Sequence, residues 1–154
     1  MKARVTASIV LALGLALGMS GCSLTAPQDT LHMQESSVGV GGTVGKVDVR
    51  NAVLITGSAD KVGNLVATFV NNEAKPHRIE VQHGGENLYV TVPAYGVKKI
   101  GGTTETRLLF TNLDAKAGAL TDVFFTYGTQ TGVTLSVPVL SSTFPGFEDY
   151  APAR

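Results

Sequence analysis

The chain has 154 residues, with 12 Lys and Arg side chains against 12 Asp and Glu side chains, so its formal net charge at pH 7 is zero. This balance argues against the basic surface of a nucleic-acid-binding protein and against electrostatic attachment to an anionic membrane. Cys22 is the only cysteine. An intramolecular disulfide is therefore excluded, and a folded domain must be stabilised by packing.

Residues 1–21 have the three parts of a secretory signal peptide. Lys2 and Arg4 form a basic start, residues 9–19 form an apolar stretch, and small residues follow. The stretch is shorter than the ~20 apolar residues that cross a bilayer. The sequence Met19-Ser20-Gly21-Cys22 resembles a bacterial lipobox. We therefore expect cleavage before Cys22 and lipid attachment to its sulfur. The alternative is an ordinary signal peptide that leaves Cys22 as a free thiol.

A mature chain from residue 22 to 154 would carry ten basic and twelve acidic side chains, because Lys2 and Arg4 are removed. Attachment to the membrane would then depend on lipid. Each buried methylene contributes about 0.8 kcal/mol, so two or three acyl chains such as palmitate hold a protein stably at a bilayer. The sequence predicts a lipoprotein anchored at the extracytoplasmic face of the cell membrane.

Residues 22–46 are rich in small and polar residues, with four glycines between positions 39 and 45. Such a composition buries little apolar surface. We expect residues 22–46 to be a flexible tether.

Residues 47–140 contain short runs of β-branched residues separated by turn residues. No sustained helical period is present, so we predict an all-β domain. In the last run, the valines and leucine at 133, 135, 137 and 139 alternate with other residues, and Pro138 indicates an edge or a strand end. The fold expected is an immunoglobulin-like or cupredoxin-like antiparallel β-sandwich. Its eight predicted strands are 47–55, 64–71, 77–82, 88–92, 97–100, 106–111, 120–127 and 133–140.

The C-terminal tail, residues 141–154, contains Phe144, Phe147 and Tyr150. It is either a strap that lies on the sandwich or a free end. Free polar tails seldom carry three aromatic residues, which favours the strap.

Four segments in order resemble the periplasmic copper chaperones of the PCuAC type, and most of all their lipid-anchored actinobacterial relatives of the LpqE type. They are residues 64–72, 92–97, 110–118 and 137–139, and the resemblance spans about residues 47–140. It implies a cupredoxin-like or immunoglobulin-like sandwich. It also implies a Cu(I) site built from His and Met side chains, which are donors suited to that ion.

The positions that match the family's His-x-Met pair hold Arg107 and Leu109. Arg107 has no lone pair to donate and Leu109 has no donor atom. The family's second cluster, a His followed by a Met-rich turn, should lie between residues 77 and 92. Met33 is the only methionine after residue 22, and it lies in the predicted tether. We therefore expect the family's copper site to be missing and no cofactor to be bound.

Substitute ligands are few. His77 and His83 are six residues apart, so on one strand they would lie about 20 Å from each other, whereas two imidazoles on one ion each lie about 2 Å from it. We interpret them as two solvated histidines. His32 and Met33 are adjacent donors that need further ligands from elsewhere. These four residues are the remaining metal candidates, and copper is the alternative cofactor.

An enzyme is not expected. The sequence contains no nucleophile elbow, zinc-ligand spacing or phosphate-binding loop. Residues 114–118, which include Asp114 and Lys116, are interpreted as a loop with solvated charges. The function predicted is a non-catalytic binding or scaffolding module of the bacterial envelope, with an envelope protein or ligand as its partner and no nucleic acid. The alternative is a copper-binding chaperone that uses ligands other than the family's.

Overall fold

The computed structural model describes residues 38–57 and 61–152. Every described residue belongs to one compact unit of the chain, which lies within residues 35–154. The predicted signal peptide, Cys22, His32 and Met33 lie outside the described residues.

The prediction of an all-β fold is confirmed, and each of the eight predicted strands has a counterpart. One 3-10 turn, η2 (Glu148–Tyr150), lies in the tail, and no helix of the described residues is long and apolar enough to cross a bilayer. The strands are β1 (Val40–Val44), β2 (Val47–Thr56), β3 (Gly63–Asn71), β4 (His77–His83), β5 (Glu86–Val92), β6 (Val97–Ile100), β7 (Leu108–Phe110), β8 (Leu120–Thr126) and β9 (Val133–Ser141).

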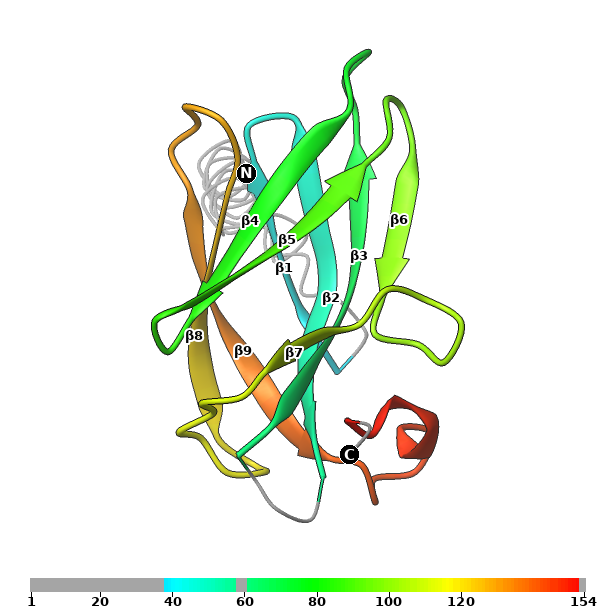
Figure 1. The fold of residues 1–154 in the computed structure, drawn as a ribbon, viewed down its shortest axis with the longest axis vertical. Helices are drawn as coiled ribbons and strands as arrows, with labels where there is room; N and C mark the ends of the chain where they lie inside the picture. The colour runs from blue at the N-terminus through cyan, green and yellow to red at the C-terminus, as the bar shows by residue number, and fades with distance from the viewer. Residues whose placement is uncertain (1–37, 58–60, 153–154) are drawn as a thin grey trace, which may run out of the picture. The chain divides into compact units, whose positions relative to one another are not determined.

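The strands form two facing layers that are joined through β9 (Figure 1). One layer contains β1, β2, β3, β6 and β7, and the other contains β5, β4, β8 and β9 in that order. All but one of the pairings between these strands are antiparallel. The exception is the end of β9, which leaves β8 and pairs in parallel with β2 from Val139 onward. The sandwich is therefore closed along this edge by a strand that belongs to both layers.

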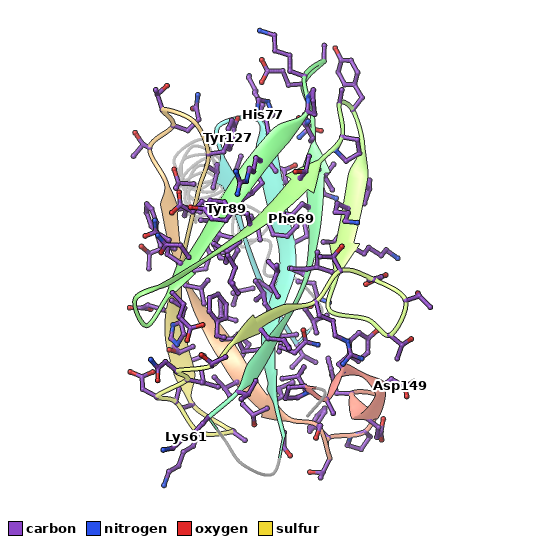
Figure 2. All side chains as sticks on the ribbon, viewed as in Figure 1. Lys61, Phe69, His77, Tyr89, Tyr127 and Asp149 are labelled. Carbon is purple, nitrogen blue, oxygen red and sulfur yellow. The ribbon has the colours of Figure 1, made fainter. Side chains whose placement is uncertain are left out.

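The core lies between the layers and is built by residues that alternate along the strands. Phe69 on β3 and Phe125 on β8 are fully buried, and their ring centroids are 6.2 Å apart across the sandwich. Phe69 is labelled in the interior of Figure 2. Apolar residues at every second position of β3, and of β8 and the residue after it, are all buried: Leu65, Ala67, Phe69, Val123, Phe125 and Tyr127.

The tether predicted over residues 22–46 is wrong at its C-terminal end. Val40–Val44 forms β1, which pairs antiparallel with β2 as far as Val44 opposite Val47. Gly45 has a φ of 56° and makes the tight turn between them. Glycines suggested a loop, but hydrogen bonds to β2 and the buried side chain of Val44 hold this segment in a strand. Residues 22–37 lie outside the described part of the chain.

A β-bulge divides β2 into two parts. Asn51 has a φ of 51°, and the register to β3 shifts between Arg50 and Val53. Before the bulge, burial alternates along the strand; after it, every residue from Ala52 to Thr56 is buried. The continuous apolar run of β2 is therefore that of a central strand.

Two details of the strand predictions need correction. Pro138 does not lie at an edge of the sheet, because β9 runs between β8 and β2. It lies opposite Leu120 at the end of the β8 pairing, one residue before the pairing with β2 begins. The predicted strand 106–111 is shorter in the structure: β7 covers Leu108–Phe110, while Thr106 forms only an isolated bridge to Ile100.

The tail lies against the sandwich as far as residue 152, where the described part ends. Asn64 donates its side-chain amide to the carbonyl oxygen of Tyr150 at 2.8 Å. Arg107 donates to the carbonyl oxygens of Ala151 and Asp149 at 3.0 and 3.2 Å. Figure 2 labels Asp149 on this segment. These bonds are what the strap interpretation predicts, and they come from two polar side chains beside the ends of β3 and β7.

Candidate functional site

The β4–β5 hairpin places His83 at the end of a strand. Gly84 and Gly85 form its two-residue turn with φ values of 56° and 81°, so both adopt the left-handed conformation that a type I′ turn requires. His83 is thereby paired with Glu86, at the first position of β5. Burial alternates along β4, and His83 is on the same inward face as Ile79 and Val81. The imidazole therefore enters the interior rather than the solvent.

The His83 ring is held in one orientation by two contacts. Its Nδ1 lies 2.9 Å from the carbonyl oxygen of Asp122, on the neighbouring strand β8. The ring also meets Phe110 edge to face, with centroids 5.4 Å apart. A carbonyl oxygen only accepts hydrogen bonds, so Nδ1 carries the proton in the neutral ring and Nε2 carries the lone pair.

The Nε2 atom of His83 is buried and has no hydrogen-bond partner, and the side chain is 5% exposed. Its nearest charged neighbour is the Asp114 carboxylate, with Oδ1 3.8 Å away on a side chain that is 84% exposed. Both atoms are acceptors while the histidine is neutral. A buried acceptor without a partner costs about 1–3 kcal/mol, so a donor or cation placed between the two would be favoured.

A groove of about 940 Å³ opens beside this pair of acceptors. It lies between the β4–β5 turn, the loop after β7, and the strands β8 and β9. Its lining combines acceptors with one lysine and small or apolar side chains: His83, Gly84, Asp114, Ala115, Lys116, Ala119, Leu120, Thr121, Asp122 and Ser136. The Asp122 carboxylate already accepts a hydrogen bond from Ser136 at 2.8 Å.

Glu86 ties the hairpin to the loop that carries Asp114. Its carboxylate accepts hydrogen bonds from the Thr111 hydroxyl at 2.7 Å and from the Thr111 backbone N–H at 3.0 Å. The hydroxyl bond from Thr111, followed by the backbone bond, lowers the pKa of Glu86 below its ordinary value of 4.5. At neutral pH this anion therefore anchors one wall of the groove.

His77 lies at the opposite end of β4. Its Nε2 is 2.7 Å from the Glu73 carboxylate, and its ring stacks on Tyr127 with centroids 4.3 Å apart. Figure 2 shows His77 and Tyr127 side by side at this end of the sandwich. The Tyr127 hydroxyl in turn accepts a hydrogen bond from the backbone N–H of Lys46 at 2.9 Å. The surroundings of His77 are those of a structural side chain.

The structure keeps the two described candidates, His77 and His83, apart. His77 and His83 begin and end one continuous seven-residue strand, which separates them by about 20 Å at 3.3 Å per residue. The interpretation of both as solvated is wrong for His83, because its side chain points inward from β4. Among residues 38–57 and 61–152, no three His, Cys, Asp or Glu side chains are grouped as metal ligands.

The two positions matched to the family's copper ligands have other surroundings. The Arg107 guanidinium donates to the carbonyl oxygens of Asp149 and Ala151, and its Nε donates to that of Gly102 at 3.4 Å. Leu109 is half-buried on β7, opposite Asn64 of β3. Arg107 therefore holds the tail in place.

Sequence reasoning missed the partners of His83. Asp114 was interpreted only as a solvated loop charge, and its high exposure agrees with that, but no sequence signal pairs it with a histidine 31 positions away. The Asp122 group involved is a backbone carbonyl, which every residue possesses. Only the register between β4 and β8 brings it to His83.

No protein-family model and no curated protein sequence matches this chain. Several solved structures are similar to it, among them three PCuAC domains. The copper-bound PCuAC domain from PmoF2 has a TM-score of 0.53 and a sequence identity of 12%. The apo PCuAC domain from PmoF1 has a TM-score of 0.54 and an identity of 13%. The apo PCuAC domain from PmoF2 has a TM-score of 0.53 and an identity of 12%.

The likeness covers 66%, 66% and 67% of this chain and 97%, 98% and 96% of those domains. At such low identity it concerns the fold. The sandwich described above is therefore of the PCuAC type.

Proposed function

We propose that this chain is a lipid-anchored, extracytoplasmic binding module of the bacterial envelope and that it has no catalytic activity. The proposed anchor is Cys22, in the sequence Met19-Ser20-Gly21-Cys22 that follows an apolar stretch. Acyl chains on this cysteine would hold the protein at the membrane, since its balanced charge gives no electrostatic attachment. The sandwich would then face the extracytoplasmic side.

The observation that carries a role in binding is the groove beside His83. The groove is lined by polar side chains and by the inward-facing imidazole of His83, whose Nε2 has no hydrogen-bond partner. Catalysis by a Ser or Thr nucleophile needs a histidine within hydrogen-bond reach of the hydroxyl. The hydrogen bonds found for the two described histidines go instead to the Glu73 carboxylate and the Asp122 carbonyl oxygen. This supports a binding role over a hydrolytic one.

Membrane attachment is tested by comparing the parent chain with Cys22→Ala in a bacterial host that processes lipoproteins. We expect the parent to incorporate a labelled palmitate and to sediment with membranes, and the variant to lose both properties. A matched Ser23→Ala variant should behave as the parent. If the Cys22→Ala protein stays in the membranes and has the same mass as the parent apart from the substitution, Cys22 is not the site of lipid attachment.

A second candidate function is copper carriage with ligands other than those of the family. It is favoured by the likeness to a copper-bound PCuAC domain. The use of Arg107 to hold the tail speaks against the family's own ligand set, and imidazoles at His77 or His83 would have to replace it. Competition for Cu(I) against a chelator separates the two candidates. Stoichiometric tight binding that is lost in His77→Gln or His83→Gln would establish the copper carrier, and its absence would leave the first proposal.

A further inference from the structure

The neighbourhood of His83 has the features of a metal-binding site, and none of its groups belongs to positions 107 and 109, which match the family's His-x-Met pair. The imidazole is fixed by the bond from Nδ1 to the Asp122 carbonyl oxygen. Histidines that bind metals commonly donate their second ring N–H to a backbone carbonyl, which fixes the tautomer and the orientation of the ring. His83 already has this arrangement, and its free Nε2 is the buried atom without a partner.

The distance from Nε2 to Asp114 suits a shared cation. Zinc lies about 2.0–2.1 Å from an imidazole nitrogen and about 2.0–2.2 Å from a carboxylate oxygen, so two such ligands at a tetrahedral angle are about 3.4 Å apart. The observed separation between Nε2 and Oδ1 is 3.8 Å. The Asp114 side chain is 84% exposed and can close this gap by a small rotation. A cation there would satisfy both acceptors at once.

The donor atoms select the class of ion. An imidazole nitrogen with a carboxylate oxygen favours divalent ions of borderline softness, zinc and copper(II), over Mg²⁺ and Ca²⁺, which prefer oxygen alone. The groove is open to solvent, so water can occupy the remaining coordination positions. Lys116 also lines it and lowers the affinity for a cation, while Glu86, next to His83 across the hairpin, raises it.

We propose that His83 Nε2 and the Asp114 carboxylate bind one divalent ion of borderline softness, zinc or copper(II), in the groove between the β4–β5 turn and the loop after β7. With only two protein ligands the ion exchanges readily. The inference names a ligand for the binding module proposed above and rests on that role.

The test uses the full chain without lipid, in detergent micelles, with Cys22→Ser to remove the thiol that is free when no lipid is attached. Zinc is titrated while the ring nitrogens of the histidines are followed by ¹⁵N NMR. We expect the His83 Nε2 resonance to shift and to reach saturation at one equivalent of zinc per chain. In competition, copper(II) should bind more tightly than zinc, and equimolar Mg²⁺ should not displace the zinc. A His83 Nε2 resonance that stays unchanged at saturating zinc overturns the proposal.

Variants in the same background locate the site. Loss of a residue that only hydrogen-bonds to a metal ligand typically lowers metal affinity about 10- to 100-fold. Because His83 is itself a proposed ligand, His83→Gln should weaken zinc binding by at least about tenfold. Asp114→Asn should weaken it as well, and this exposed substitution keeps the fold if His83→Gln unfolds. His77→Gln and His32→Gln are matched controls that remove an imidazole elsewhere. Equal affinity of the parent and Asp114→Asn, or loss of binding only in a control, refutes the site.

Failure of this test is distinguishable from failure of the proposed function. Lipid attachment is read from palmitate incorporation and sedimentation, and neither depends on His83. A protein that binds membranes but not zinc would overturn the metal site alone.

Discussion

Replacing Arg107 with alanine should release the C-terminal tail from the sandwich. Its guanidinium donates to carbonyl oxygens of Ala151 and Asp149 at 3.0 and 3.2 Å, and to Gly102 at 3.4 Å. A hydrogen bond that involves a charged group contributes about 1.5–3 kcal/mol. Arg107 is half-buried, one bond is long, and water can replace the donor after truncation. We therefore expect a loss of about 1–2 kcal/mol in the free energy of unfolding.

Two assays measure this change. Urea denaturation should show the lower free energy, and the Tm should fall by about 4–8 °C. Chymotrypsin cleaves after Phe144, Phe147 and Tyr150, so it reports detachment of the tail. If detachment becomes easier by 1–2 kcal/mol, trimming should accelerate about 5- to 30-fold.

Lys99→Ala is the matched control, because it removes an exposed cation of β6 on the same layer. It should leave both readouts within error of the parent. Trimming of Arg107→Ala at the parent's rate, with no change in the free energy of unfolding, would show that Arg107 does not hold the tail.

Three further predictions follow from the contacts. Phe125→Ala should lower the free energy of unfolding by about 3–5 kcal/mol in the urea assay, because this ring is fully buried against Phe69. Phe144 is 47% exposed, so Phe144→Ala should change the free energy of unfolding by about 0.5 kcal/mol or less in the same assay. Tyr127→Phe should cost about 0.5–1.5 kcal/mol in thermal unfolding, because the backbone N–H of Lys46 loses its acceptor; equal stability would refute the importance of that bond. Folding lowers the pKa of Glu86. Its contribution to the free energy of unfolding is therefore fully present above pH 4.5 and is lost as the pH falls through the pKa of the folded state. Glu86→Gln should therefore lower stability slightly at pH 7, by less than about 1 kcal/mol because the group is solvent-exposed, and the difference from the parent should vanish in acid.

The strands were predictable where apolar residues alternate or run continuously. The alternation of β3 and β9 indicates strands with one face on a core, whereas the apolar run of β2 indicates a strand that is buried on both faces. β1 was not predictable, because its glycines favour a loop and only pairing with β2 stabilises it. The parallel contact between β2 and β9 was also missed, since local periodicity holds no information about which strands meet.

The site around His83 was predictable only in part. The Gly84-Gly85 turn places this histidine at a strand end, which the sequence indicates. Its inward orientation depends on the register of β4 with β5 and β8, and the approach of Asp114 depends on the path of a loop. The role of Arg107 depends on where the tail folds back, which is a tertiary property.

Lipid attachment at Cys22 can be read from the intact mass of the mature protein, isolated from the membranes of a bacterium that makes it. We expect a chain that begins at residue 22 and carries the added mass of two or three acyl chains on its first residue. A chain that begins at another residue, or one that begins at residue 22 without added mass, would contradict this expectation.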